Sequence, residues 1–583
     1  MRGVQSRAVR PPAEASHAAT LALFCLVALA VVGPWAIGSV LPAARLALVL
    51  VALAAVAVGL LTGALRGSLT LPAVAAWPLA GFLALALAQL VPLPEPLHRL
   101  LAPGSHAVWH PPDPEVARLL GAGARPLSVD PDTTLEALAL SAGLALLALV
   151  AAPALVRERL AVRAVAAVAL SGFALSAYAI LARARFGALL YGRIPVPTVA
   201  PFGPFVSKNH FAGWCAMAAL LTAGLALGLA EAARRRSRDW TTDARAGGVI
   251  LALVATLAMA LATLASLSRG GVMALVAGCG CLLALRLLDP RRSRAVLLPT
   301  LVVTILLGVI LVGLVPREAQ ERMTTLSGAP FRLETWKGAL RLAATSPLVG
   351  HGLGAFHDAY PRFKRDYGIV RVEHAENDYL ETLAETGALG LGLVLAGFGW
   401  LLSAGGRGFA EGRDAAARGI GQGALAALAA LAVHSGVDFN LRIPSNAALA
   451  ALAAAMVAAA AGLRPRPLAR PVALALAVGV VALAAATLAR APGGWTSARQ
   501  EVVAAASAQT QAAQHLRLER ARSALGGVLR RRPAHAESWL MLGGVEQALG
   551  RHATAVAFAR HAAWLDPERP GLKDAVAAIE ASP

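Results

Sequence analysis

Apolar runs close to twenty residues long recur along most of this chain, and they limit its fold more than any other feature. As helices, such runs are long enough to cross a hydrocarbon layer about 30 Å thick. Apolar residues make up 57% of the 583 residues and charged residues only 15%, which excludes a soluble domain of this size. The runs are rich in Ala and Leu and lack the alternating segments of a β-barrel. We therefore predict an all-α, polytopic membrane helix bundle of about 12–13 transmembrane helices.

Thirteen membrane spans are predicted, of which the fourth and the eleventh have the weakest pattern. The first also resembles a signal peptide, but it lacks a clear cleavage site, so we interpret it as a membrane helix. The spans are residues 18–38, 45–64, 70–93, 135–153, 161–182, 210–230, 246–266, 271–288, 296–315, 386–404, 419–436, 443–462 and 471–490.

The arginines predict an orientation. With the N-terminus in the cytoplasm, the N-terminal tail and the even-numbered connections carry most of them, Arg286 and Arg418 included. The short connections of the other face hold only Arg45, Arg269 and Arg442. Positive charge is expected on the cytoplasmic side of a membrane protein. The net charge of +20 therefore reflects orientation, and we do not expect nucleic acid as a partner.

The chain divides into four predicted parts. They are an N-terminal transmembrane bundle (1–315), a large outer loop (316–385), C-terminal transmembrane helices (386–491) and a polar tail (492–583). Within the tail, Trp539, Leu542, Gly543 and Ala555 stand at the offsets of the 34-residue tetratricopeptide repeat. Residues 498–583 hold at most two such repeats, fewer than usually fold alone. We expect the tail to lean on the membrane domain or on a protein partner, and a plain helical cap is the alternative.

Arg269 is the first candidate for chemistry. It lies between two apolar spans, in a tight break that ends in Gly270 and Gly271. A charge at the membrane edge is costly unless it is solvated or paired. Either the side chain snorkels to the interface, or its planar fork lines a cavity and binds phosphate oxygens. The two glycines would let the backbone turn sharply and a ligand approach.

The large loop opens with a predicted amphipathic helix in which Arg332 and Trp336 share a face. A helix lying on the membrane surface explains the same pattern. The glycine-rich stretch 346–356 follows. It resembles a phosphate-binding loop only weakly, because it lacks a following Lys-Ser/Thr and a preceding strand.

His374 begins a helix-like run that reaches Glu385 and closes at Gly387. On a helix, His374, Asp378 and Glu381 would share one face, with Asn377 beside them. Imidazole suits proton transfer near neutral pH, and a carboxylate could hold its tautomer. A metal site is not favoured, since no second His or Cys follows at ligand spacing. A solvated helix start remains an alternative.

Two further polar clusters are predicted on the same face. Lys208 and Asn209 precede the sixth span, and His434 and Asp438 lie between the eleventh and twelfth. Each cluster alone is typical of an ordinary loop. Their convergence on one face makes them, with Asn377 and Asp378, candidates for substrate binding.

The motifs SKNHFAG, SLSRGG, FRLETW, GHGLGAF, HAENDYLETLAETG and HSGVDFN occur in this order between residues 207 and 440, within a resemblance that covers about residues 18–465. This series resembles the O-antigen ligase and polymerase superfamily of bacterial membrane glycosyltransferases. The resemblance implies a GT-C-like fold in the bacterial inner membrane, with the large loop and the tail in the periplasm. It implies transfer of a glycan from an undecaprenyl diphosphate donor to a glycan or lipid acceptor, among membrane lipids and without a metal or cofactor.

By position, the resemblance implies that Arg269 and Arg332 bind the donor diphosphate and that His374 activates the acceptor hydroxyl. His434 and Asp438 match a less uniform region. Many ligases have Asn or Ser directly after the histidine, whereas Ala375 and Glu376 intervene here, so ligase and polymerase both stay open. The tail resembles that of exopolysaccharide systems. A glycan transporter and a scaffold that recruits partners through residues 498–583 are the alternative functions.

Overall fold

The computed structural model describes residues 17–66, 70–72, 76–196, 200–236, 245–289, 329–365, 368, 370–408, 414–460, 465–490 and 494–581. The predicted ninth span, 296–315, lies outside the described residues, as do the first arginines of the chain.

Twelve apolar helices form the bundle, one for each predicted span that falls in the described residues. They are α1 (His17–Val32), α2 (Pro42–Arg66), α3 (Ala76–Ala88), α7 (Pro131–Ala151), α8 (Glu158–Phe186), α9 (Lys208–Arg236), α10 (Arg245–Ala265), α11 (Arg269–Leu288), α16 (Asp378–Gly408), α17 (Ala415–Ser435), α18 (Pro444–Ala460) and α19 (Arg470–Ala489). Ten are long and apolar enough to cross a membrane, and α3 and α18 are shorter. The protein is therefore an all-α, multi-pass membrane protein, as predicted.

Short elements connect these helices. They are the helices α4 (Glu95–Leu101), α5 (Pro103–Trp109), α6 (Pro114–Leu120), α14 (Ala329–Thr345) and α15 (Phe356–Ala359), and the 3₁₀ turns η1 (Gly33–Trp35), η2 (Ile37–Ser39), η3 (Ala152–Val156), η5 (Pro361–Phe363) and η6 (Asn440–Arg442). Within the part of the chain that the structure describes, strands form two antiparallel ladders, β1 (Thr70–Pro72) with β4 (Pro465–Pro467) and β2 (Leu189–Leu190) with β3 (Ile194–Pro195). The predicted amphipathic helix at the start of the large loop is α14.

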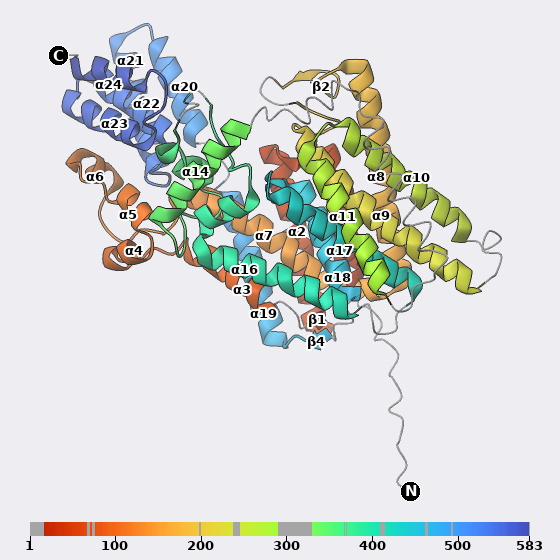
Figure 1. Ribbon diagram of the computed structural model, residues 1–583. Coiled ribbons are helices and arrows are strands. Elements are labelled where there is room, and N and C mark those ends of the chain that lie inside the picture. The colour runs from red at the N-terminus through yellow and green to blue at the C-terminus, as the bar shows by residue number, and fades with distance from the viewer. Residues whose placement is uncertain are drawn as a thin grey trace.

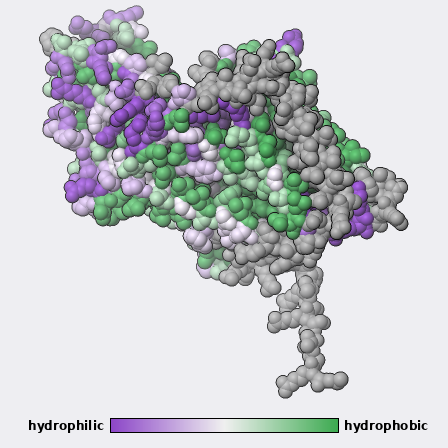
Figure 2. Space-filling model, viewed as in Figure 1, coloured by the Kyte–Doolittle hydropathy of each residue, from purple (hydrophilic) through white to green (hydrophobic). Residues whose placement is uncertain are grey.

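The tail consists of α20 (Gly494–Ala506), α21 (Gln511–Leu529), α22 (Ala536–Ala548), α23 (His552–Leu565) and α24 (Leu572–Ala581). Figure 1 shows these helices beside α4–α6 at one end of the molecule. Polar side chains gather over that end in Figure 2, and apolar side chains cover the bundle. One apolar core joins the tail to the loops, because Trp539 and Leu525 pack in the same cluster as Val116, Leu342 and Phe356. The tail therefore leans on the outer loops of its own chain.

Two arginines that the sequence analysis assigned to the connections between spans lie inside helices. Arg286 belongs to α11 and Arg418 to α17, and both are buried. Arg286 and Arg418 pair with Glu231 of α9, and the Nε of Arg418 lies 2.9 Å from a carboxylate oxygen of Asp289. Buried charges persist only when paired, so these arginines join three helices rather than mark a solvated loop.

The tail offers a test of its docking. Trp539 is fully buried and its indole N–H donates to the carbonyl of Pro533 at 2.8 Å. We expect Trp539→Ala to destabilise the tail by about 3–5 kcal/mol through cavity formation. Trp77→Ala is the matched control, because Trp77 is 68% exposed on α3. Pulse proteolysis of the full-length protein in detergent measures the change, and equal stability of the two variants would contradict the docked arrangement.

Candidate functional site

The imidazole of His374 is held by a carboxylate. Its Nδ1 lies 2.9 Å from Oε1 of Glu381, whose other oxygen accepts from the backbone N–H of Ala375 at 2.8 Å. A carboxylate only accepts, so Nδ1 carries the proton and Nε2 keeps its lone pair. Burial lowers the pKa of His374, but the charge of Glu381 and its hydrogen bond outweigh burial and raise the pKa above its usual value. The arrangement suits a general base that acts through Nε2.

The sequence predicted that the helix begins at His374, and this is wrong. The helix begins at Asp378, because the side-chain oxygen of Asn377 accepts from the N–H groups of Tyr379 and Leu380 at 3.0 and 3.1 Å. This is the bonding of an N-cap residue. His374 therefore lies in the preceding loop, and it reaches Glu381 across the helix start rather than along one helix face. The predicted break at Gly387 is confirmed, with φ 65° inside α16.

Arg442 joins this helix to the segment after α17. Its guanidinium lies 3.2 Å from Glu381, 2.7 Å from Glu385 and 4.0 Å from Asp378. The three carboxylates stand at i, i+3 and i+7 and so share one face of α16. Burial lowers the pKa of Arg442, but the three carboxylates outweigh burial and raise it. Arg442 thereby fixes the carboxylate that holds His374.

Phe439 connects His374 to a second cluster. Its ring stacks on His374 with centroids 4.1 Å apart and meets the edge of His210 at 4.6 Å. His210 Nε2 lies 3.4 Å from Asp438, and His434 Nε2 lies 3.9 Å from the other oxygen of Asp438. Burial raises the pKa of Asp438, but the hydrogen bond from His210 and the two histidines outweigh burial and lower it to about 2. Asp438 is thus a fixed anion between two imidazoles.

Arg332 reaches the same region from α14. Its guanidinium lies 3.3 Å from Glu376, two residues after His374, and its side chain is 29% exposed. Glu376 has a φ of 55°, which a non-glycine residue rarely adopts. Burial raises the pKa of Glu376. The Arg332–Glu376 pair therefore places α14 against the strained loop that carries His374.

The turn before α11 carries Arg269 and is docked on the start of α9. The hydroxyl of Ser268 donates to the side-chain oxygen of Asn209 at 2.9 Å, and the Lys208 ammonium donates to the carbonyl of Leu267 at 3.1 Å. Arg269 opens α11, where the helix dipole adds positive potential. These contacts place the start of α9 beside the turn that carries Arg269.

The glycines of this turn have a different role from the predicted one. The backbone turns at Leu267, which has a φ of 56°, whereas Gly270 and Gly271 lie within α11. A Cβ on Gly270 would lie 2.8 Å from Nε2 of His434. Close packing against the imidazole therefore requires Gly270.

The glycine-rich loop is also a packing element. The N–H groups of His351 and Gly352 donate to the carbonyls of Ala384 and Glu385, and that of Leu353 donates to the side chain of Gln89. A Cβ on Gly350 would overlap the backbone of Glu385. These amides are occupied by the protein, so the loop is not a phosphate cradle. It instead fixes the kinked end of the first part of α16.

A cavity of about 760 Å³ lies beside His374. Its charged part includes Arg45, Glu136, Arg371, His374, Glu381 and Arg442, and its apolar walls come from α3, α7, α16 and α18. Asp378 also lines the cavity, and its carboxylate accepts from the hydroxyl of Ser435 at 2.7 Å. Arg269, Arg332, His434 and Asp438 do not line it. The structure thus separates the predicted residues into a cavity group around His374 and a neighbouring group beyond Phe439.

Several residues of the site were not predicted from the sequence. Arg442 and Arg45 were not predicted as site residues, and His210 and Phe439 were predicted only as members of the two polar clusters. The arginine distribution could have indicated two of them, because Arg45 and Arg442 are among the few arginines in the short connections of the outer face. Asn377 was predicted to bind substrate. In the structure its amide donates to the carbonyl of Gly436 while its oxygen caps α16, so the fold engages both of its ends.

Comparison with known proteins supports the resemblance seen in the motifs. The family model described as O-antigen ligase matches residues 254–395. This range includes Arg269, Arg332, His374 and Glu381, and it ends before His434 and Arg442. No curated protein matches the chain. The match supports an O-antigen ligase-like membrane protein of glycan assembly.

Arg442 provides a test of the site's geometry. Its side chain is 16% exposed, and Arg442→Met would leave three carboxylates without their cation. We expect a loss of about 3–5 kcal/mol of stability, since removing one partner leaves uncompensated buried charge. Thermal unfolding in detergent measures the change. Arg183→Met, at an exposed arginine of α8, is the control and should leave the unfolding temperature unchanged. Wild-type stability of Arg442→Met would contradict the ion-pair assignment.

Proposed function

We propose that this protein is a membrane glycosyltransferase that moves a glycan from a lipid diphosphate carrier to an acceptor hydroxyl, with His374 as the general base. The observation that carries the proposal is the position of the Glu381-held imidazole at the charged end of an otherwise apolar cavity. A lipid-linked sugar needs this combination, because its chain requires apolar walls and its diphosphate requires cations.

The chemistry follows from the donor. The acceptor oxygen attacks the anomeric carbon, the bond from that carbon to the diphosphate breaks, and the hydroxyl proton passes to Nε2 of His374. Undecaprenyl diphosphate, the proposed carrier, leaves with the electron pair. A diphosphate is a good leaving group, so the protein mainly holds its charge and removes one proton. No metal is needed in this scheme.

Arg332 and Arg269 are proposed to hold the diphosphate beside the cavity, in the neighbouring group beyond Phe439. Arg332 has one carboxylate partner, Glu376, and remains partly exposed. Arg269 adds a guanidinium at the start of α11, whose N–H groups also favour anions. Lys208, His434 and Asp438 complete this group and are proposed to orient the sugar. Ligase and polymerase chemistry share these steps.

The proposed orientation keeps the N-terminus in the cytoplasm of a bacterial inner membrane and places the site in the periplasm. The arginine distribution supports it. The shared core of the tail, α6 and α14 gives further support, since parts that pack together lie on one side of a membrane. The tail is proposed to be tetratricopeptide-like and open to a protein partner on its remaining surface.

Substitution of the charged groups tests the assignment. We expect His374→Ala to lower glycan transfer by about 10²–10⁴-fold, the usual contribution of a general base. Arg332→Ala and Arg269→Ala should each cost about 10²–10³-fold, as for one lost oxyanion donor. Transfer from a purified lipid-linked donor in proteoliposomes measures the rates. His515→Ala, on the exposed face of α21, is the control.

Arg45→Ala discriminates between the two groups of arginines. Arg45 lines the cavity and has no ion pair within 4 Å among the described residues. If Arg45→Ala abolishes transfer while Arg332→Ala retains it, the diphosphate lies inside the cavity and the role given to Arg332 is wrong. If His374→Ala keeps the wild-type rate, the proposed mechanism fails altogether.

The pH dependence tests the role of Glu381. Only neutral His374 can accept a proton, so kcat/KM should rise with pH through a midpoint above 6.5, the side to which Glu381 moves the pKa. Glu381→Gln removes the carboxylate charge while burial still lowers the pKa. The midpoint should therefore move to lower pH. Glu580→Gln, in the tail, should leave it in place. A midpoint that is unchanged or higher in Glu381→Gln would show that Glu381 does not tune the base.

A further inference from the structure

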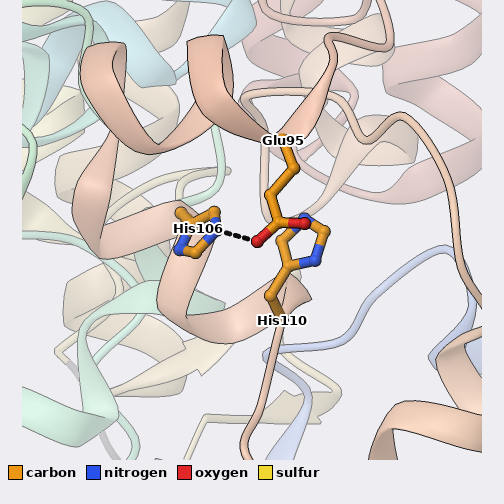
Figure 3. A group of neighbouring side chains, drawn as sticks. All are labelled: Glu95, His106 and His110. Atoms are coloured by element: carbon orange, nitrogen blue, oxygen red, sulfur yellow. Dashed lines mark hydrogen bonds and ion pairs between the residues drawn. The ribbon is translucent and has the colours of Figure 1, made fainter.

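Two histidines and a glutamate lie close together on the short helices α4 and α5, away from His374. His106 and His110 are four residues apart on α5 and its C-terminal end, and Glu95 opens α4. Figure 3 shows the Glu95 carboxylate directed between the two imidazoles. One ligand atom from each of the three residues lies within 4.8 Å of the others.

We propose that Glu95, His106 and His110 form a binding site for one zinc ion, with water as the fourth ligand. Two imidazoles at i and i+4 of a helix face the same side and can share a metal. Two histidines and one carboxylate are an established zinc ligand set, and it leaves one position open.

The distances suit a metal better than a hydrogen bond. His106 Nε2 lies 3.4 Å from Oε1 of Glu95, which is long for a hydrogen bond to a carboxylate. Two ligands of one tetrahedral zinc, at bond lengths of about 2.0–2.1 Å, stand about 3.3 Å apart. The rings of His106 and His110 lie 4.5 Å apart at 22°, so a small rotation brings their nitrogens to a common ion.

An unsatisfied nitrogen points to a missing ligand. Nε2 of His110 is buried and has no hydrogen-bond partner among the described residues, although its ring is half-buried beside a carboxylate. A buried polar atom without a partner is costly.

A second group of metal-ligand spacing among the described residues shows such a site occupied by a cation of the protein itself. Asp130, His357 and Asp358 also lie within 4.8 Å of one another. The guanidinium of Arg532 lies 3.1 Å from Asp130 and 3.0 Å from Asp358. That guanidinium takes the place of a cation. Glu95 has no arginine partner among the described residues, and Arg125 instead donates to the carbonyls of Leu120 and Gly121 and covers the ring of Trp109.

A zinc ion here would clamp α4 to α5. The N–H of Gly104 in α5 donates to the hydroxyl of Ser346 in the large loop at 3.2 Å. The indole of Trp109 donates to the carbonyl of Ser128 at 3.1 Å. The clamp would therefore stabilise the outer loops that pack around α14. It does not depend on the proposed transfer reaction.

Zinc titration of the full-length protein tests the site. The protein is purified in detergent without a polyhistidine tag, stripped with a chelator and titrated with ZnCl₂ against a chromophoric zinc indicator. We expect one equivalent bound by the wild type, with affinity lower by at least about 100-fold in His110→Ala and about tenfold in Glu95→Gln. His515→Ala is the control and should bind as the wild type does. Absence of binding, or equal binding by His110→Ala, overturns the proposal.

A spectroscopic measurement covers the case in which a histidine variant fails to fold. Co²⁺ added to the wild type should give the visible absorption of a four-coordinate site, and ZnCl₂ should displace it. Glu95 is exposed, so Glu95→Gln should fold and should change this spectrum. A spectrum identical in the wild type and in Glu95→Gln places the bound metal elsewhere and overturns the proposal.

Discussion

The site depends on the ion pairs of Arg442. Three carboxylates on consecutive turns of α16 cannot be buried together without a cation, and Arg442 supplies it from the segment between α17 and α18. The pairing fixes the height of α16 against its neighbours. It also fixes Glu381, which then sets the tautomer and the orientation of His374. A single side chain, Glu381, therefore connects the ion pairs of Arg442 to the imidazole of His374, which we propose as the general base.

Small residues of α9 and α17 allow these two helices, which carry polar segments of the site at their ends, to pack closely. A Cβ on Gly224 would overlap the carbonyl of Gly419, and one on Gly228 would lie 2.8 Å from the carbonyl of Ala415, so α9 and α17 meet backbone to backbone. Close approach through small residues is how membrane helices associate without a hydrophobic driving force. The same contact continues to the site, where a Cβ on Gly213 would lie 3.0 Å from Nδ1 of His434. The histidines at the helix ends are thus positioned by packing within the membrane part.

Local sequence patterns predicted the helices, but they did not predict contacts between residues that are far apart in the sequence. Hydropathy and length are properties of one segment, so each of the twelve predicted spans in the described residues has its helix. The bounds were less accurate: the span 70–93 begins in the strand β1 and its helix is only Ala76–Ala88, and the helix of the span 386–404 begins at Asp378. The start of α16 was misplaced because the side chain of Asn377 caps the helix three residues after His374. A helical wheel shows which residues share a face but not where the helix begins. Glu381 was grouped correctly with His374. Its partner Arg442 lies 61 residues away in sequence and was interpreted only as an orientation signal. The role of Gly270 needed the imidazole of His434, which no sequence pattern places beside it.

The tail contributes to the same arrangement rather than standing apart from it. Arg532 neutralises Asp130 and Asp358, two carboxylates with almost no exposed surface. Asp130 caps α7, accepting from the N–H of Thr133 at 3.1 Å, and the first turns of α7 form part of the cavity wall. Without the tail, two buried carboxylates would lose their cation at the start of a helix that lines the cavity. Loss of function on deleting the tail would then follow from the electrostatics of the outer loops, whether or not the tail binds a partner. Single substitutions on its exposed helix faces, which leave Arg532 in place, separate these two roles.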